Sequence, residues 1–136
     1  MKLFFLLMAA VSLSLAAQWE RSGETVIDPS EKLQWADDRG AEQRDTVWRD
    51  AKKYCANLEL EGFYDWRLPT LSELQGLVAA SLADEVSFDH AAASAYWTSE
   101  IYKKMPINAW AVYWGNGHTF DTDRCDEAHV RCVRNR

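Results

Sequence analysis

The protein has 136 residues, of which 48% are hydrophobic, 12% aromatic and 26% charged, with three cysteines and seven tryptophans. This length fits one domain, and the apolar content can offset the entropy of ordering the chain, which excludes wholesale disorder. The net charge of −6 opposes binding to a nucleic-acid backbone, so we expect no nucleic-acid partner.

The first 17 residues have the layout of a secretory signal peptide. Lys2 supplies a positive charge, and an uncharged apolar run ends in small residues at Ala17, where cleavage is favoured. A membrane span needs roughly 20 apolar residues, and polar residues from Gln18 onward end this run too early. We therefore predict a signal peptide over 1–17, a single mature domain over 18–136, and no stable membrane insertion after removal. The net charge then changes from −6 to −7, because loss of Lys2 leaves 14 basic residues against 21 acidic ones.

Export would place all three cysteines in an oxidising compartment. We predict that the protein is periplasmic or secreted, where disulfides form. Cys55, Cys125 and Cys132 all lie in the predicted mature chain. An odd number of cysteines allows one disulfide and leaves one thiol over, and the residues alone leave the pairing open.

The mature chain begins with a predicted β-hairpin. Two short β-prone runs, 25–27 and 33–35, flank a segment that contains Pro29, and proline favours a turn there. The polar residues 37–40 follow, and we interpret them as a connection to the first helix.

Two helices are predicted next. Apolar residues recur with helical spacing between 47 and 58, a pattern that places Cys55 in the core. Asp45 or Thr46 is the expected N-cap of this helix, and Gly62 is its expected end. The second helix runs from 70 to 80, because Thr70 and Glu73 have the spacing of a capping box and leucines repeat behind them. A long connection over 81–94 follows.

From Tyr96 onward the apolar pattern changes to a period of two, which is typical of strands. Trp110, Val112 and Trp114 are predicted on one face of a strand. We expect most of the seven tryptophans to be buried and at most two exposed, because a small domain needs large aromatic side chains to form its core.

The remaining strands complete an antiparallel sheet. Asn116–Gly117 is a strong hairpin-turn signal, 118–120 is the expected return strand, and 129–134 is the expected last strand. The order of a hairpin, two helices and an antiparallel sheet defines an α+β fold.

Five blocks of the sequence resemble, in order, the signature segments of the Lcl C-terminal domain family, an exported bacterial family of formerly unknown function. The Asp65–Thr70 part is the most specific. The blocks are Thr25–Asp28 with Leu33–Trp35, Trp48–Cys55, Gly62–Thr70 with Glu73–Leu74, Tyr96–Ser99, and Val130–Arg134.

The resemblance implies a C-type-lectin-like fold in which a twisted antiparallel sheet joins the N-terminal and C-terminal strands. It also implies a disulfide that attaches a helix to the last strand, which would be Cys55–Cys132 and would leave Cys125 as a free thiol. The competing pair, Cys125–Cys132, closes a much shorter loop and would stabilise the fold less.

The block around Arg67 looks like a catalytic motif, because a guanidinium beside Asp65 can bind a carboxylate or sulfate with two hydrogen bonds. We interpret the block as structural instead, with a buried tryptophan, a helix entrance, and Arg67 bonded to loop carbonyls or to Asp65. The residues of this structural motif are Asp65, Trp66, Arg67, Pro69, Thr70 and Glu73.

The same residues argue against an enzyme and against a metal site. The resemblance extends distantly to sulfatase-modifying factors, which need two reactive thiols, but Cys132 is assigned to the disulfide and carboxylates surround Cys125. The acidic run 121–127 has neither the spacing nor the central glycine of a calcium loop. Because the three histidines are scattered singly, we predict no metal, no cofactor and no catalytic residue.

The primary hypothesis is an exported, non-enzymatic binding or adhesion module for a glycan or a cell-envelope component. Its expected ligand surface combines 99–108 with 121–127, since irregular segments on a rigid sheet commonly carry recognition. The candidate residues are Tyr102, Lys103, Lys104, Asp121, Asp123 and Arg124. The alternative is a periplasmic structural protein that binds an envelope protein, with Cys125 as a point of contact, and a thiol- or metal-dependent enzyme comes third.

Overall fold

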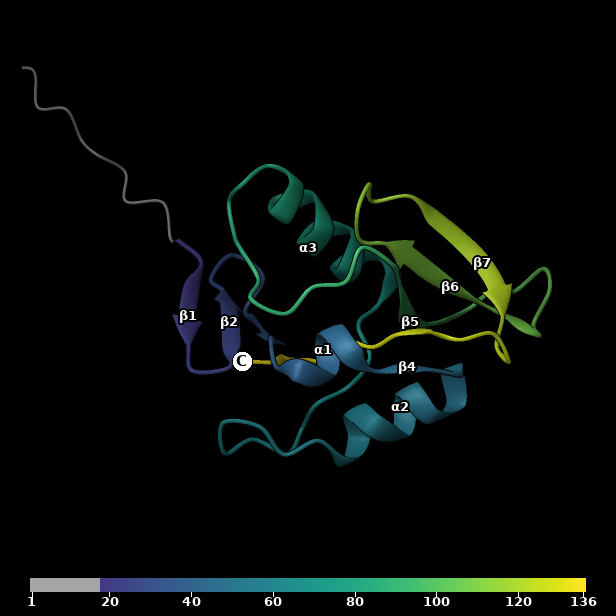
Figure 1. Ribbon diagram of the computed structural model, residues 1–136, viewed down its shortest axis with the longest axis horizontal. Helices are drawn as coiled ribbons and strands as arrows, with labels where there is room; N and C mark the ends of the chain where they lie inside the picture. Colours follow the sequence, from purple (N-terminus) through teal and green to yellow (C-terminus); the bar gives the residue numbers. More distant parts are fainter. Residues whose placement is uncertain (1–17) are drawn as a thin grey trace, which may run out of the picture.

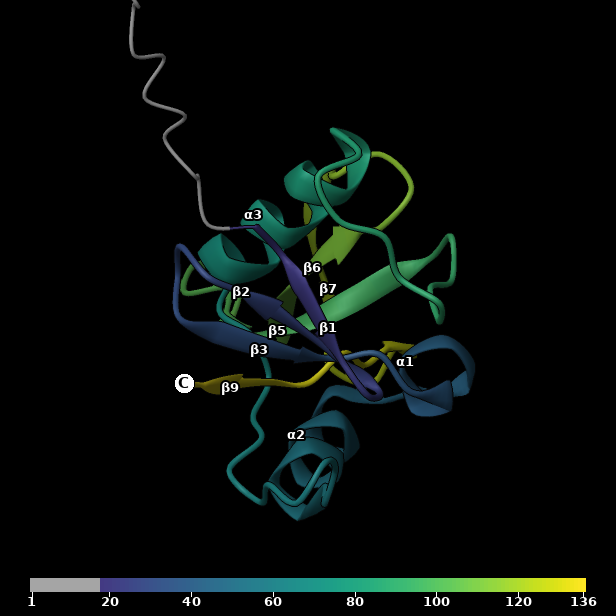
Figure 2. The same cartoon turned by 90° about the vertical axis from the view of Figure 1, so that its left-hand side faces the viewer.

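Two β-sheets form the fold, and the first of them joins the two ends of the domain. The computed structural model describes residues 18–136, so the predicted signal peptide over 1–17 lies outside the described residues. The four-stranded sheet has the antiparallel order β1 (Glu20–Ser22), β2 (Thr25–Asp28), β3 (Leu33–Ala36) and β9 (Val133–Asn135). The predicted hairpin is β2–β3, and β3 pairs with β9, which confirms that the terminal strands meet (Figure 2).

The second sheet has five strands. Their order is β4 (Asp45–Thr46), β8 (Ala128–His129), β5 (Ala95–Ile101), β6 (Asn108–Tyr113) and β7 (Thr119–Asp123). β5 and β8 run parallel, and the other neighbouring strands are antiparallel. The predicted turn at 116–117 joins β6 to β7, where Gly117 has a φ of 75° that suits glycine.

The described residues contain three helices, α1 (Arg39–Gln43), α2 (Trp48–Asn57) and α3 (Leu71–Leu82). α2 and α3 lie on opposite sides of the sheets (Figure 1 and Figure 2). Both correspond to the predicted helices. The capping box of α3 is present, because the Thr70 hydroxyl accepts a bond from the Glu73 N–H while the Glu73 carboxylate accepts one from the Thr70 N–H.

Within residues 18–136, the helices are too short or too polar to cross a bilayer.

The caps predicted for α2 are wrong. Asp45 and Thr46 do not cap this helix, because both belong to β4 and pair with β8. Val47 precedes the helix instead, and its side chain makes no capping hydrogen bond. The helix ends at Asn57, well before Gly62, which lies in a later turn with a φ of 78°. Asp45 and Thr46 are residue types that favour helix N-caps, but here they pair with β8 as a strand instead.

Two short elements lack a sequence signal. β1 consists of three exposed polar residues that pair with β2, so it has no apolar alternation. α1 occupies part of the predicted polar connection over 37–40. It begins where the Asp38 side chain accepts a hydrogen bond from the Ala41 N–H at 3.3 Å. Five residues are too few for a helical period to show.

The single last strand predicted over 129–134 is also wrong, because the chain crosses there from one sheet to the other. β8 belongs to the second sheet and β9 to the first. Between them, Arg131 and Cys132 both turn into the core. Their side-chain bonds fix this crossover.

Apolar side chains form two clusters on the two faces of the second sheet. Tyr96 and Trp97 are adjacent in β5 and belong to different clusters, since successive side chains of a strand alternate. The prediction that most tryptophans are buried is confirmed. Trp19 and Trp110 are half-buried, and the buried ones are Trp35, Trp48, Trp66, Trp97 and Trp114.

A disulfide attaches α2 to the segment before β9. It joins Cys55 and Cys132, whose Cα atoms are 5.5 Å apart and whose side chains are buried. Cys125 is exposed and has a free thiol. The pairing implied by the family resemblance is therefore confirmed.

A buried ion pair holds the ends of several segments together. The Arg131 guanidinium donates to the Ala36 carbonyl at 2.7 Å, to the Asp37 carboxylate at 3.4 Å, and to the His90 carbonyl. Arg131 and Asp37 have no exposed side-chain surface. The guanidinium also lies over the rings of Phe88 and Trp114, 4.5 and 4.6 Å from their centroids, so aromatic faces compensate part of its desolvation.

The Asp37 carboxylate is held ionised by its donors. Burial by itself raises its pKa, but hydrogen bonds from the Asp89 N–H, the Arg21 side chain and the His90 N–H, together with the charge of Arg131, lower the pKa overall. These donors come from β1 and from the long connection before β5. One carboxylate thus connects three other parts of the chain, β1, the long connection before β5 and the crossover between β8 and β9, to the end of β3.

We expect the Cys55→Ala/Cys132→Ala double variant to lose about 4 kcal/mol of unfolding free energy, because the disulfide spans 77 positions and restricts the unfolded chain. Urea unfolding of the mature protein measures this loss. Cys125→Ser is the matched control and should leave the unfolding free energy unchanged. Equal stability of the double variant and the wild type would contradict the assignment.

Candidate functional site

The two segments predicted to form the ligand surface lie side by side at one end of the second sheet. The side-chain amide of Asn108 donates to the Asp121 carboxylate at 2.9 Å, and the Arg124 N–H donates to the Ile107 carbonyl at 2.9 Å. Tyr102 packs edge-to-face on Trp110, with ring centroids 5.0 Å apart, and so anchors the β5–β6 loop. The structure therefore brings the predicted segments together.

An apolar hollow of about 630 Å³ lies where these segments meet the beginning of α2. Its lining residues are Val47, Trp48, Arg49, Ile107, Asp123, Arg124 and Cys125. Trp48 is only 7% exposed, and its indole N–H donates to the Thr98 carbonyl at 2.8 Å, so its ring is fixed in place. We call this feature the Trp48 hollow.

Exposed apolar side chains continue from the Trp48 hollow onto the β5–β6 loop. Ile107 is 58% exposed and Met105 is 50% exposed. Ile101 at the end of β5 is also exposed. Adjacent exposed apolar residues on a small acidic domain are typical of an interaction surface.

The cations and the carboxylates of these segments differ in whether they have bonding partners. Lys103, Lys104, Arg49 and Arg124 belong to none of the ion pairs found among residues 18–136. Three nearby aspartates accept local hydrogen bonds instead, Asp121 from Asn108, Asp123 from the Cys125 N–H, and Asp126 from the Thr122 hydroxyl. Asp50 and Glu127, each within two positions of a lining residue in the sequence, are exposed. The lining itself presents two unpaired guanidinium groups.

Two cations already lie over the Trp48 ring. The Lys52 ammonium nitrogen is 4.7 Å and the central guanidinium carbon of Arg124 is 5.4 Å from the ring centroid. An aromatic face that carries cations is not free to stack on a sugar ring. What remains accessible at the hollow is apolar side-chain surface with positive charge at its edge.

The conspicuous block around Arg67 is occupied by structural bonds. Arg67 donates to both carboxylate oxygens of Glu73, at 2.7 and 2.8 Å, and also bonds the Asn135 side chain. Of the two contacts expected for Arg67, the bond to a loop carbonyl is confirmed, because Arg67 donates to the Leu68 carbonyl at 3.3 Å. The contact with Asp65 is wrong, because Asp65 accepts from Arg134 at 2.7 Å. The reason is geometric: the capping box holds Glu73 beside Arg67, so its carboxylate takes the guanidinium.

Both carboxylates of this block have lowered pKa values with structural causes. Hydrogen bonds from Arg67, opposed by burial and supplemented by the Thr70 N–H, lower the pKa of Glu73. The hydrogen bond from Arg134 lowers the pKa of Asp65. Trp66 is buried, and its indole N–H donates to the Phe63 carbonyl at 3.1 Å. This arrangement agrees with the structural interpretation of the block.

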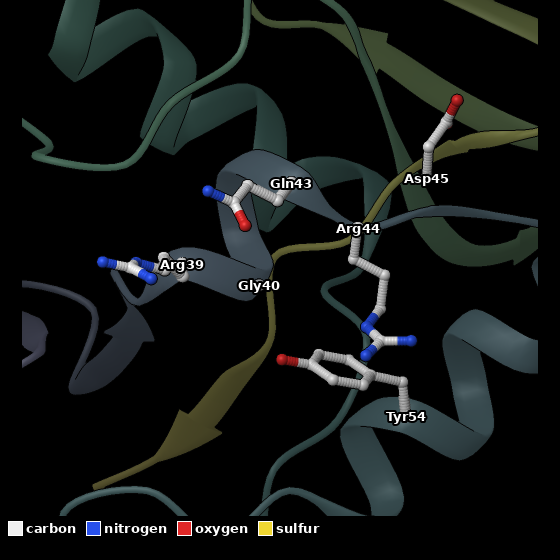
Figure 3. Close-up of a pocket in the computed structure, with 6 residues that line it drawn as sticks. All are labelled: Arg39, Gly40, Gln43, Arg44, Asp45 and Tyr54. Carbon is white, nitrogen blue, oxygen red and sulfur yellow. The ribbon is translucent and has the colours of Figure 1, made fainter.

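A second hollow, of about 500 Å³, lies between α1 and α2 (Figure 3). The Arg44 guanidinium lies 4.3 Å from the centroid of the Tyr54 ring, and burial and the Asp38 charge raise the pKa of Tyr54. A Cβ at Gly40 would collide with the Tyr54 hydroxyl, so a larger residue there requires the tyrosine side chain to shift. Figure 3 shows Asp45 pointing away from the tyrosine, so the polar groups do not converge on one point. The Trp48 hollow is therefore the better candidate.

Within the described residues, no group of three or more histidine, cysteine, aspartate or glutamate side chains is placed to hold a metal ion. His90 bonds the Glu42 carboxylate at 2.8 Å, and His129 lies 3.7 Å from that of Asp45. The histidines thus contact α1 and β4 singly. That the protein uses no metal or cofactor stays a prediction.

Several residues of the site were not among the candidate residues predicted from the sequence. Trp48 and Arg49 belong to the predicted first helix and gave no sign of facing the loops. Met105 and Ile107 did carry a signal, since two large apolar residues in a polar loop have no core to join. Only the fold brings the helix start beside this loop.

Comparison with solved structures defines the class of fold. Botrocetin matches with a TM-score of 0.51 over 86% of this chain and 100% of its own chain, at 12% sequence identity. This likeness shows a C-type-lectin-like fold. The family model of the Lcl C-terminal domain matches residues 24–134, and the chain therefore belongs to that family. The search of curated proteins gave no match.

We expect Arg67→Ala to lower the unfolding free energy by about 1–2 kcal/mol, because two charge-assisted bonds to a partly exposed carboxylate are lost. Thermal and urea unfolding measure the change. Arg39→Ala removes an exposed arginine without an ion-pair partner and should change stability by less than about 0.5 kcal/mol. Equal effects of the two variants would contradict the structural role of Arg67.

Proposed function

We propose that the protein is an exported, non-enzymatic binding module of the bacterial cell envelope. Its ligand surface is the β5–β6 loop, the segment 121–127 and the Trp48 hollow. The observation that carries the proposal is the convergence of irregular segments on one apolar hollow with unpaired cations. Such loops on a rigid scaffold are where recognition is commonly located.

The scaffold supports a binding role rather than catalysis. Every carboxylate with a shifted pKa, namely Asp37, Asp65 and Glu73, is bonded to an arginine within the fold. None of the three lines the Trp48 hollow. Catalytic acids and bases instead need a shifted group that faces a ligand.

A glycan and an envelope protein are the two ligand classes to be compared. Lys103 and Lys104 are exposed cations on the loop, and they suit an acidic glycan or peptidoglycan fragment. The apolar lining and the exposed Ile107 favour a protein partner. Both classes use the same end of the molecule.

Binding of the mature protein, residues 18–136, to arrays of glycans, peptidoglycan fragments and synthetic peptides tests the proposal. We expect saturable binding to at least one class of probe, and weaker binding by Lys103→Ala/Lys104→Ala because two cations leave the surface. Arg39→Ala/Arg136→Ala is the matched control, since it removes two exposed arginines elsewhere. The proposal fails if no probe binds saturably. It also fails if the arginine control variant loses as much binding as the Lys103→Ala/Lys104→Ala variant.

A further inference from the structure

We infer that the Trp48 hollow binds an apolar side chain carried by an acidic segment of a partner protein. This inference rests on the proposed function and names the ligand class for the same site. Three observations lead to it: the apolar lining, the unpaired arginines at the edge, and the exposed apolar loop beside them.

The lining selects for an apolar group. The lining also contains the polar side chains of Arg49, Asp123 and Arg124, but its apolar part, Val47, Trp48 and Ile107, offers few hydrogen-bond partners. The indole N–H of Trp48 is already used by the Thr98 carbonyl. A sugar placed there would lose hydration from its hydroxyl groups without replacement bonds, which is costly. An apolar side chain loses nothing of this kind and gains from burial.

The edge of the hollow selects for negative charge. Arg49 is exposed and has no ion-pair partner, and Arg124 is bonded through its Nε only weakly, to the Ile107 carbonyl at 3.4 Å. Guanidinium groups bind carboxylates with two parallel hydrogen bonds. Asp123 also lines the hollow, but its carboxylate accepts a hydrogen bond from the Cys125 N–H, whereas the two guanidinium groups have no ion-pair partner. Charge complementarity to these arginines therefore favours aspartate or glutamate beside the inserted apolar side chain, although the protein as a whole is acidic.

The adjoining loop enlarges the apolar contact. Ile107 lines the hollow, and Met105 lies two positions before it on the same loop; both are at least half exposed. Methionine adapts its shape to a partner because its side chain is unbranched and polarizable. A central apolar pocket with arginine at its edge has the composition of an interface hot spot.

A second copy of this chain fits the surface less well. Asp126 and Glu127 lie next to the exposed Cys125, and a two-fold arrangement centred on this thiol would face each carboxylate with its own copy. The favoured occupant is thus a different, acidic protein segment.

The test uses short synthetic peptides with one leucine, phenylalanine or tryptophan between aspartates and glutamates. A second series replaces the acids with asparagine and glutamine, and a third with lysine. Fluorescence polarisation gives affinities, and the NMR signal of the Trp48 indole N–H reports occupancy of the hollow. We expect acidic peptides to bind about tenfold more tightly than their amide counterparts and to shift the Trp48 signal.

Two variants and two matched controls localise the binding. Ile107→Ser and Arg124→Gln should each weaken binding of the acidic peptides by about tenfold, the first through lost burial and the second through lost charge. Tyr64→Ser changes an apolar residue that is 68% exposed elsewhere, and Arg39→Gln changes a distant arginine, so neither should alter the affinity.

The outcomes separate this inference from the proposed function. Binding of glycans or peptidoglycan fragments without binding of acidic peptides would overturn the inference and leave the proposed function standing. The inference would also be overturned if Ile107→Ser left the affinity for the acidic peptides unchanged, or if these peptides bound without shifting the Trp48 signal. If no probe of any class binds, both fail.

Discussion

The fold depends on one charge that is buried among aromatic rings. Arg131 has no exposed side-chain surface, and Asp37 is its ionic partner at 3.4 Å. An unpaired guanidinium in that position would be strongly destabilising, so the carboxylate must be present and ionised. Because Asp37 also accepts bonds from β1 and from the connection before β5, the pair fixes where the end of β3, the long connection and the crossover between β8 and β9 meet.

The bonds of the Arg131–Asp37 pair do not include the β5–β6 loop or the segment 121–127 at the other end of the second sheet. The disulfide fixes the C-terminal part of α2, while the start of α2 is held by the Trp48 N–H, which donates to the Arg124 carbonyl at 3.1 Å. The hollow is therefore placed by the helix that the core anchors, and its lining combines the start of this helix with residues of the β5–β6 loop and of the segment 121–127. The buried pair and the disulfide stabilise the scaffold, so the residues that line the hollow do not have to stabilise it.

The sequence predicted the elements whose signal is local. The hairpin, α2, α3 and the turn at Gly117 follow from periodicity and capping, and the disulfide follows from the family resemblance. The split between β8 and β9 was not predictable, because it depends on Arg131 turning inward, and an arginine in a basic run gives no sign of burial. The loop part of the site was predicted, whereas Trp48 and Arg49 reach it only through the packing of α2 against residues fifty or more positions away.

Unfolding of the wild type and Asp37→Asn in urea, measured between about pH 7 and pH 2, tests the central role of the buried pair most directly. The pKa of Asp37 is lowered in the folded protein, so its stabilisation is complete above about pH 5 and is lost as the pH falls. We predict that Asp37→Asn is about 3–5 kcal/mol less stable at neutral pH, or unfolded, and loses much of the acid sensitivity. Wild-type stability in Asp37→Asn, with an unchanged pH profile, would contradict the account.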